Sequence, residues 1–450
     1  MRVFLYDKSM KRTVIKDTPQ KVGEEVVISG WVSHVRDHGK IAFLDVRDYT
    51  GSVQIVGAPE VFNGPRAESA VRITGLVKAR PEKLVNTKIV TGTIEIEATH
   101  CEILSQAQEL PFDMGKETLE LELPTLLDHR ALTLKHPSQV AIFKLQEAVA
   151  EGFRKCAKEL DCMEVHTPTI AASATEGGAE VFKVDYYGHD AFLIQSPQLY
   201  KQMAVGDFER VFLLSHVYRA EPSVTTRHLS EVIQMDVEIA FIEDFTQLLD
   251  ALEFVGVGMI DYAAKTRPEV LEMYGIESPL IPPTVPRLTL REAQAIVTKR
   301  TGRDLSHELD LNPEDEREIC IWAKEEHASD FVTITHFPTK KRAFYTMPDP
   351  IDPEYSLSYD LLFRGLEISS GSQRINNYEQ LVMVMKDRGF NPDNFELYLQ
   401  TFKYGMPPEG GFSFGLERIT MKLLELKNVR EASLFPRDME RVDIRLSKLS

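Results

Sequence analysis

The sequence HVYRAEPSVTTRHLSEVIQMDVEIAF, residues 216–241, decides the fold of the larger part of this 450-residue chain. Two apolar runs flank a polar turn, which predicts two β-strands. Arg219 and Glu221 are two positions apart on the first strand, so they face the same side of a sheet. The same spacing relates Asp236 to Glu238 on the second. Buried charges at this density are costly unless they are compensated, so the stretch predicts either a ligand site or an internal network of ion pairs.

The segments on both sides of this stretch predict a large α+β domain from residue 136 to residue 450. Residues 141–160 repeat apolar positions at helical spacing, and EVHTPTI, residues 164–170, then turns extended. Further strands are predicted in the runs AFLIQSPQL, YDLLFRGLEISSGSQ and GGFSFGLER, and further helices over residues 243–265 and 417–426. The chain has no βαβ rhythm and no GxxxxGKS/T loop, so any nucleotide would bind without the common nucleotide fold.

The first hundred residues have a different pattern. Five short alternating runs between residues 25 and 104 are separated by Gly, Pro and Asn, and they predict a small barrel whose strands Gly30 and Gly75 can bend. Such a barrel fits an OB-fold, although the alternation fits any small β-domain. We therefore predict a domain over residues 1–104. Residues 105–135 have no sustained periodicity and predict a hinge.

Composition indicates an ordinary globular chain with an uneven charge distribution. The net charge is −17, but residues 1–104 hold 15 of the 52 basic and 13 of the 69 acidic residues, so only this part is suited to a polyanion. The start, MRVFLYDKSMKRT, lacks the features of a signal peptide, and no run is apolar enough to cross a bilayer. We expect a cytoplasmic protein without a membrane segment. The four cysteines show no metal-ligand spacing, which favours buried thiols.

A second cluster of chemically active residues lies in GGFSFGLERITMKLL, residues 410–424. Consecutive glycines allow close backbone approach before a strand, and Glu417 and Arg418 then open a helix. Arg418 presents a planar cation suited to phosphate or carboxylate. An arginine at a helix start is more often a solvated side chain, so this segment alone does not decide between the two readings.

Three segments together resemble the class II aminoacyl-tRNA synthetases. The helix leading into EVHTPTI, the RAE…RHLSE hairpin and the GLER helix resemble motifs 1, 2 and 3 of that family, in the same order. SATEGGAEVF, QSPQLYKQ, EISSGSQR and LFPRD look like the compact archaeal-type aspartyl-tRNA synthetases. The resemblance covers nearly the whole chain. It implies an OB-fold domain that reads the anticodon and a catalytic domain with a central antiparallel sheet flanked by helices.

The family's ATP-binding roles transfer to residues of motifs 2 and 3. The resemblance implies that Arg219 holds the α-phosphate and Arg418 the γ-phosphate, where both neutralise charge during phosphoryl transfer. Glu221 would accept a hydrogen bond from adenine. Arg227 and His228 would lie over the phosphates. Mg²⁺, a hard ion that prefers oxygen ligands, would be oriented by Glu367 and Ser370.

Selection of aspartate would fall to a second set of residues. The resemblance places Lys201 and Arg374 at the side-chain carboxylate. It places Glu176, Gln198 and Asp236 near the ammonium group, with Ser370 also in the aspartate site. An asparagine amide would leave the Arg374 cation poorly paired, which gives a strong discrimination. Asparaginyl enzymes typically read SGQL where this chain reads QSPQ, which favours aspartate.

In the barrel, five residues match positions that contact the anticodon in this family: Ser33, Arg36, Phe43, Gln54 and Glu95. Phe43 would stack on a base and Gln54 would read a base edge; the alternative for Phe43 is a core side chain. Ser33 stands where strictly tRNA(Asp)-specific archaeal-type enzymes have a tryptophan. This leaves open whether the partner is tRNA(Asp) alone or also tRNA(Asn).

The resemblance also implies a homodimer, yet Asp161 and Cys162 replace the glycine and aromatic residue that usually open motif 1. Two alternatives remain from the sequence. One is an asparaginyl-tRNA synthetase. The other is a noncatalytic RNA-binding or regulatory paralogue. The joint presence of four charged residues disfavours it, because a decayed site usually loses such charges: Arg219, Glu221, Glu367 and Arg418.

Overall fold

The computed structural model describes residues 12–87, 89–116, 118–173, 180–222 and 225–448. The chain divides into two compact units, Met1–Leu121 and Glu122–Ser450. The division lies inside the segment predicted as a hinge, and two short helices, α2 (Leu123–Asp128) and α3 (Arg130–Thr133), follow it. The domain bounds given above stay predictions. None of the helices in the described part of the chain has the length and apolar character needed to span a bilayer.

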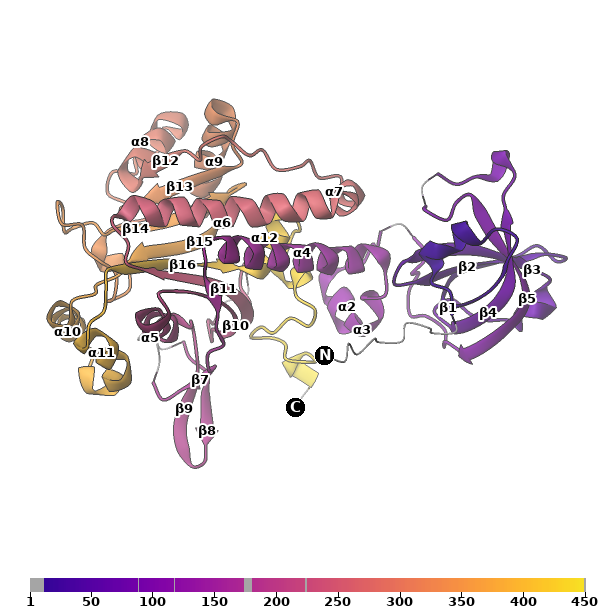
Figure 1. The fold of residues 1–450 in the computed structure, drawn as a ribbon, viewed down its shortest axis with the longest axis horizontal. Coiled ribbons are helices and arrows are strands. Elements are labelled where there is room, and N and C mark those ends of the chain that lie inside the picture. Colours follow the sequence, from indigo (N-terminus) through magenta and orange to yellow (C-terminus); the bar gives the residue numbers. More distant parts are fainter. Residues whose placement is uncertain (1–11, 88, 117, 174–179, 223–224, 449–450) are drawn as a thin grey trace, which may run out of the picture. The chain divides into compact units, whose positions relative to one another are not determined.

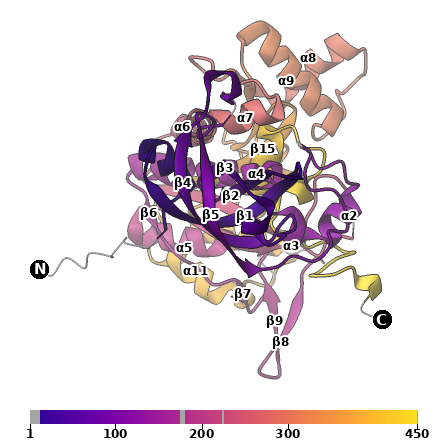
Figure 2. The ribbon, with the colours of Figure 1, turned by 90° about the vertical axis from the view of Figure 1, so that its right-hand side faces the viewer.

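The first unit is a closed five-stranded barrel in the order β1-β2-β3-β5-β4, as predicted (Figure 2). Its strands are β1 (Glu25–Asp37), β2 (Ala42–Asp48), β3 (Gly51–Gly57), β4 (Ala70–Ala79) and β5 (Ile94–Ser105). Buried and accessible residues alternate along each strand, so one side of every strand fills the barrel. The register of β4 against β5 shifts at Gly75, where a Cβ would lie 2.5 Å from a carbonyl oxygen of β5. The short helical segment η1 (Ile15–Lys21) precedes β1, and α1 (Pro59–Phe62) and η2 (Glu82–Leu84) connect β3 to β4 and β4 to β5.

The second unit is built on an eight-stranded mixed sheet in the order β12-β13-β14-β15-β16-β11-β10-β6 (Figure 1). The six central strands pair antiparallel, as predicted, while β12 and β6 add parallel pairs at the two edges. The strands are β6 (Met163–Glu164), β10 (Arg210–Tyr218), β11 (Glu231–Ala240), β12 (Arg287–Thr289), β13 (Phe331–Thr335), β14 (Ser358–Phe363), β15 (Leu366–Gln373) and β16 (Glu409–Gly415). A separate small sheet has the order β7-β9-β8, with β7 (Ile170–Ala171), β8 (Lys183–Tyr186) and β9 (His189–Leu193).

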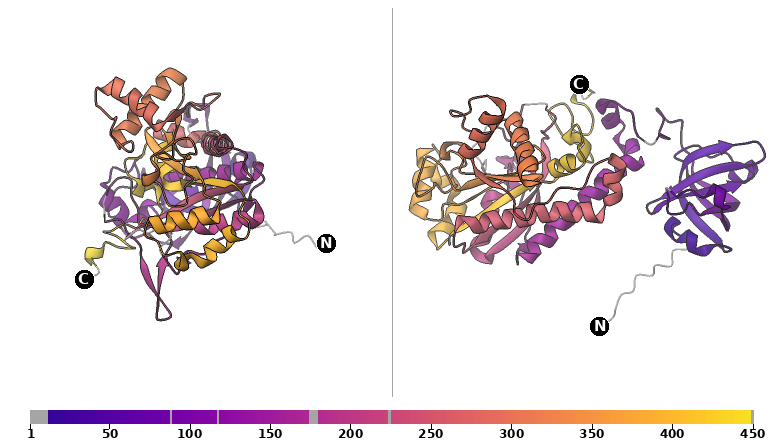
Figure 3. Two further views of the ribbon diagram at one scale, coloured as in Figure 1. Left: turned by 90° about the vertical axis from the view of Figure 1, so that its left-hand side faces the viewer. Right: turned by 90° about the horizontal axis from the view of Figure 1, so that it is seen from above.

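Two long helices, α4 (Pro137–Glu159) and α6 (Phe245–Thr266), run side by side over one face of this sheet (Figures 1 and 3). Met235 and Val237 of β11 pack against them in the main apolar core. The alternate residues of β11 point to the opposite face, where helix α5 (Gln198–Phe208) lies. The two-residue period of β11 therefore separates an apolar face from a charged one.

The remaining helices surround the edges of the sheet. They are α7 (Pro268–Tyr274), α8 (Leu290–Thr301), α9 (Pro313–His327), α10 (Tyr378–Asp387), α11 (Glu396–Lys403) and α12 (Leu416–Leu423), with short helices η3 (Thr339–Lys341), η4 (Pro392–Phe395), η5 (Val429–Ala432) and η6 (Leu446–Lys448). Helices α8 and α9 share a core with β13, and α10 and α11 share one with α5. All four cysteines are buried thiols.

Two local predictions were wrong. The strand β10 ends at Tyr218, so Arg219 and Glu221 lie just beyond it and do not belong to the strand, although the Arg219 amide still donates to Ser230. The run AFLIQSPQL is a strand only to Leu193, and helix α5 begins at its Gln198. In both places a turn with proline nearby ends the extended run earlier than its apolar pattern indicates.

Replacing Phe153 with alanine should destabilise the second unit by about 3–5 kcal/mol, because the ring is fully buried and leaves a cavity. The ring centroid of Phe153 lies 5.8 Å from that of Phe212 and 6.4 Å from that of Phe414. Urea unfolding measures the loss. The matched control is Leu397→Ala on α11, where the side chain is 66% exposed, and an equal loss in both variants would contradict this packing.

Candidate active site

A pocket of about 220 Å³ opens on the charged face of the sheet between β11, β15, β16 and α12. It collects all the residues predicted to bind ATP, together with Ser370. Its lining comprises Arg219, Glu221, Arg227, His228, Leu229, Val232, Gln234, Glu367, Ile368, Ser369, Ser370, Ser413, Phe414, Gly415, Glu417, Arg418 and Val429. These residues come from segments up to two hundred positions apart, and the antiparallel sheet brings them together.

The loop between β10 and β11 supplies one wall of the pocket. The guanidinium of Arg219 lies 3.6 Å from the Glu221 carboxylate, and His228 Nε2 lies 3.3 Å from the same carboxylate. Arg227 Nη1 lies 3.4 Å from Glu316 Oε2 on α9. The distances are long for ion pairs, so these side chains are only loosely committed to one another.

The opposite wall carries Arg418 and Glu367. Arg418 is the third residue of α12, and its Nη1 lies 3.9 Å from Glu367 Oε1. Desolvation by the surrounding protein and the nearby Asp360 carboxylate raise the pKa of Glu367 to about 7, against the opposing effect of Arg418. The pocket is thus lined by three arginines, Arg219, Arg227 and Arg418, each with an acid beside it. Anionic phosphate groups would replace these acids as partners of the arginines. A metal ion would allow an acid and a phosphate group to remain side by side.

Glu417 forms part of the floor. Its carboxylate is 5% exposed and accepts the Ile233 amide at 3.1 and 3.2 Å. Burial raises the pKa of Glu417 to about 7. Glu417 is the second residue of α12, and its carboxylate is hydrogen-bonded to β11. It therefore connects two of the elements that line the pocket.

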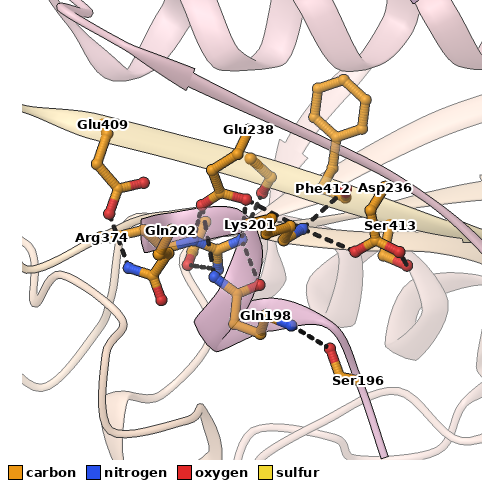
Figure 4. A network of polar contacts seen from close by, with 12 residues as sticks. Ser196, Gln198, Lys201, Gln202, Asp236, Glu238, Arg374, Glu409, Phe412 and Ser413 are labelled. Atoms are coloured by element: carbon orange, nitrogen blue, oxygen red, sulfur yellow. Dashed lines mark hydrogen bonds and ion pairs between the residues drawn. The ribbon is translucent and has the colours of Figure 1, made fainter. Parts of the chain in front are cut away.

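A buried network of charges lies beside the pocket on the same face of the sheet (Figure 4). Lys201 of α5 has all three ammonium hydrogens engaged: its Nζ lies 2.8 Å from Asp236 Oδ1, 3.0 Å from Glu238 Oε2 and 3.2 Å from the Phe412 carbonyl oxygen. The lysine is 1% exposed, and both carboxylates are fully buried. The ammonium group therefore holds α5, β11 and β16 together.

Arg374, the residue after β15, is the second cation of this network. Its Nε donates to Glu238 Oε1 at 2.8 Å, Nη1 to Ser372 Oγ at 2.6 Å, and Nη2 to Gln198 Oε1 at 3.2 Å and to the Gly411 carbonyl oxygen at 3.0 Å. The second hydrogen of Nη1 has no acceptor within the described residues.

Position 411 must be glycine because its backbone lies directly against the Glu238 carboxylate, which binds both cations. A Cβ there would lie 2.1 Å from Glu238 Oε2, so any side chain would push that carboxylate off the two cations. Of the glycines of β16, Gly411 therefore serves the charge network, whereas Gly415 lines the pocket.

One hydrogen bond connects the pocket, which holds the predicted ATP residues, to the buried network, which holds most of the predicted aspartate residues. Ser413 lines the pocket and donates to Asp236 Oδ2 at 3.2 Å. Lys201, Arg374, Gln198 and Asp236 lie in the network and do not line the pocket. Glu176 lies outside the described residues. The predicted ATP and aspartate residues are thus neighbouring groups on one face of the sheet.

Several residues of the site were not identified from the sequence. Among them are Gln202, Arg342, Asp360 and Glu409, which are buried or half-buried polar side chains around the network and the pocket. Glu316 of α9 also reaches the pocket, because its carboxylate accepts the Glu367 amide at 3.4 Å. All residues of β14 and the first four of β16 are buried, so no period of two distinguishes Asp360 or Glu409 in the sequence. Nothing in the sequence near Glu316 connects it to the site.

The oxygen groups beside Glu367 fit the Mg²⁺ that the family implies. Asp360 Oδ1 is buried without a hydrogen-bond partner in the described chain, and the Ser370 hydroxyl accepts from Arg342 at 3.0 Å. The described residues contain no group of three side chains arranged to hold a metal by themselves. This combination suits Mg²⁺, which commonly takes one or two carboxylates and completes its shell with phosphates and water.

In the barrel, the five predicted anticodon residues lie on four strands. Arg36 and Phe43 face each other across β1 and β2, with the guanidinium carbon 6.0 Å from the ring centre and 3.0 Å between Arg36 Nη2 and Asp45. Gln54 on β3 pairs with Asp45 on β2. These three form one half-exposed polar and aromatic strip suited to stacking and base-edge contacts.

The other two predicted anticodon residues lie on the same or neighbouring strands. Ser33 on β1 accepts a hydrogen bond from Arg47 at 3.0 Å and lines a groove of about 640 Å³ in the first unit. Glu95 on β5 lies 3.8 Å from Arg80 and is level with Gln54 in the parallel register of β3 and β5. The five residues thus come from four consecutive strands of the barrel, which a single-stranded nucleic acid could contact together.

Comparison with known proteins gives the class. Residues 122–439 match the family described as tRNA synthetases class II (D, K and N), and residues 26–104 match the OB-fold nucleic acid binding domain. Solved structures agree. An asparaginyl-tRNA synthetase from Pyrococcus horikoshii complexed with asparaginyl-adenylate has a TM-score of 0.85 at 30% identity and covers 96% of this chain and 99% of that one. A putative aspartyl-tRNA synthetase from Leishmania major has a TM-score of 0.87 at 30% identity, covering 98% and 97%. The chain therefore belongs to the class II tRNA synthetases and is an enzyme.

Curated relatives narrow the family. The aspartate–tRNA(Asp/Asn) ligase of Thermus thermophilus is 41% identical over 96% of this chain and 99% of that protein. The aspartate–tRNA(Asp) ligase of Pyrococcus furiosus is 38% identical over 94% of this chain and 97% of that protein. Within the class, the chain is a member of the aspartate–tRNA ligases.

The raised pKa of Glu417 makes the stability of the second unit depend on pH. The folded carboxyl keeps its proton up to about pH 7, whereas the unfolded one loses it near the ordinary glutamate pKa of 4.5. Stability should therefore fall as pH rises from about 4.5 to 7 and then level off. Glu417→Gln should remove this contribution, so the variant should gain up to about 3 kcal/mol over wild type at pH 8 and much less at pH 5. Urea unfolding at both pH values measures it, and an equal difference at both would contradict a buried acid.

Proposed function

We propose that this enzyme joins aspartate to ATP in the pocket between β11, β15, β16 and α12, and then transfers the aspartyl group to tRNA. In the first step an oxygen of the α-carboxylate attacks the α-phosphorus and pyrophosphate leaves. In the second, a hydroxyl of the terminal adenosine of tRNA attacks the aspartyl carbonyl and AMP leaves. The observation that carries the proposal is the convergence of Arg219, Glu221, Glu367 and Arg418 on one pocket.

In this pocket the residues would mainly position and neutralise. The aspartate carboxylate is already a nucleophile, so no general base is required in the first step. Arg219 would bind the α-phosphate and Arg418 the γ-phosphate, and their loose pairing with Glu221 and Glu367 supports an exchange of partners. Arg227 and His228 would lie over the phosphates. Glu221 would then be free to accept from the adenine amino group.

Mg²⁺ would be held by Glu367 and Ser370. When bound, it would supply charge neutralisation between phosphate oxygens. The raised pKa of Glu367 is consistent with a carboxylate that becomes fully ionised once a cation binds nearby.

Aspartate selection would depend on Arg374 and Lys201. The remaining Nη1 hydrogen of Arg374 can donate to one oxygen of the side-chain carboxylate, and Lys201 can contribute by exchanging one of its present partners. Gln198, Asp236 and Glu176 would surround the ammonium group. An asparagine side chain would turn an amide donor toward this buried cationic edge, which is unfavourable.

An asparaginyl enzyme is the second candidate, because structures of asparaginyl-tRNA synthetases are among the similar ones. Pyrophosphate exchange driven separately by each amino acid distinguishes them. Exchange with aspartate and none with asparagine supports the proposal, and the reverse result overturns it.

We also propose that the enzyme charges both tRNA(Asp) and tRNA(Asn), works as a homodimer and is cytoplasmic, where its tRNA substrates are used. Breadth is supported by the small Ser33, and by the names of the Thermus thermophilus and Deinococcus radiodurans relatives, both aspartate–tRNA(Asp/Asn) ligases. The dimer and the location rest on the family resemblance.

Arg418→Ala should lower aspartate-dependent pyrophosphate exchange at least a thousandfold, because it removes a phosphate-binding cation from a preorganised site. Lys422→Ala is the matched control: it removes a positive charge from the same helix, but Lys422 does not line the pocket. Wild-type exchange in Arg418→Ala would show that the phosphates bind elsewhere.

Ser33→Trp should reduce charging of tRNA(Asn) at least tenfold while tRNA(Asp) charging stays within about threefold, since a bulky ring would fill the groove beside Arg47. Acylation of the two purified tRNAs side by side measures this. Ser52→Trp on β3 is the control for a large ring on the barrel. Equal loss for both tRNAs, or no charging of tRNA(Asn) by the wild type, would contradict the proposed breadth.

A further inference from the structure

Glu409 is a fully buried carboxyl group that the proposed reaction does not use. It is the first residue of β16 and stands opposite Ala240 of β11. Its backbone carbonyl accepts the amide of Arg374 at 2.9 Å. The residue is thus attached through its main chain to the arginine proposed to bind the substrate carboxylate.

The side chain of Glu409 is fixed by a chain of buried hydrogen bonds. Gln202 Nε2 on α5 donates to Glu409 Oε1 at 2.7 Å (Figure 4), and the Tyr398 hydroxyl on α11 donates to Gln202 Oε1 at 3.0 Å. Gln202 is fully buried and Tyr398 is 3% exposed. Because these side chains are buried from solvent, their hydrogen bonds to the protein set the orientation of Glu409.

The charges of the network do not balance unless one acid is neutral. Two cations, Lys201 and Arg374, face three buried acids, Asp236, Glu238 and Glu409. Asp236 and Glu238 each form an ion pair, whereas no cation of the described chain lies within ion-pair distance of Glu409. An unpaired buried carboxylate costs several kcal/mol.

The Oε2 atom of Glu409 is buried and has no donor within the described residues. Glu238 is two positions from Ala240 on β11, so its side chain lies on the same face of the sheet as that of Glu409, and a protonated Glu409 can donate a hydrogen bond from Oε2 to the Glu238 carboxylate. Burial, and then the Glu238 charge, raise the pKa of Glu409 well above its ordinary value. Glu409 therefore acts as a donor to Glu238 and an acceptor from Gln202.

We propose that Glu409 is a positioning residue of the aspartate site, which fixes the Glu238 carboxylate and, through it, the orientation of Arg374 and Lys201. This inference rests on the proposed function. Glu238 contacts both cations, so a shift of its carboxylate moves both at once. With Glu409 in place, the guanidinium of Arg374 keeps its bonds to Glu238 through Nε and to Ser372 through Nη1, which fixes the orientation of its Nη1 edge.

Two substitutions of similar volume separate hydrogen bonding from packing. Glu409→Gln keeps an acceptor for Gln202 and a donor for Glu238, and the KM for aspartate should stay within about threefold of wild type. Glu409→Met fills the space without either bond. It should raise the KM for aspartate at least tenfold while the KM for ATP changes less than twofold. Aspartate-dependent pyrophosphate exchange measures all of these values.

Glu396→Gln, at an exposed carboxylate of α11, is the control and should match wild type. Equal KM values for aspartate in Glu409→Gln and Glu409→Met, whether both unchanged or both raised, would overturn the proposal. If Glu409→Met does not fold, Glu409→Asp replaces it. That side chain is too short to reach both partners, so its KM for aspartate should rise about fivefold or more, and an unchanged value would overturn the proposal. Wild-type protein without aspartate-dependent exchange would overturn the proposed function together with this inference, whereas an active wild type with unaffected variants overturns the inference alone.

Discussion

The pairing of Arg374 with Glu238 in the dry face of the sheet is the interaction on which the rest of this site depends. The guanidinium is 4% exposed and the carboxylate fully buried. Removing either partner would leave the other charge unpaired in a medium that solvates it poorly, at a cost of about 3–5 kcal/mol. The pair also fixes geometry. It requires glycine at position 411, holds α5 against the sheet through Lys201, and sets how closely β15, β16 and β11 approach.

This arrangement explains why a chain with a net charge of −17 can bind anions. Arg219 and Arg418, the arginines proposed to bind phosphate, line one small pocket, and their acidic neighbours lie 3.6 and 3.9 Å away, too far for tight pairs. Such cations remain available to a ligand and are already oriented. The low-dielectric network beside them raises the strength of any further electrostatic contact. Local geometry therefore decides binding, and the average charge of the chain does not.

The fold was largely predictable because its period-two and helical patterns are strong. The five barrel runs, the hairpin of β10 and β11 and the helices α4 and α6 all follow from alternation or helical spacing. The ends of elements were less predictable. Arg219 and Glu221 lie past β10 because a proline follows them, and only the tertiary contacts of the loop decide where they point.

The residues of the site could be predicted from the sequence where they lie in a recognisable motif, and could not be predicted outside the motifs. Arg219, Glu367 and Arg418 could be named because they lie in recognisable segments, and the pocket contains all three. Glu316 and Glu409 could not, since a single acid in a helix or at a strand start is ordinarily solvated. Their importance comes from burial, which depends on long-range packing that no local pattern encodes. The division between an open pocket and a closed network beside it was likewise visible only in three dimensions.

The most direct test of this account is a crystal structure of the protein with a nonhydrolysable aspartyl-adenylate analogue. The account predicts the aspartate side-chain carboxylate within hydrogen-bond distance of Arg374 Nη1, with Glu238 still bound to Arg374 Nε and the adenine beside Glu221. A bound analogue whose side chain lies away from Arg374, with the buried network unchanged, would contradict it.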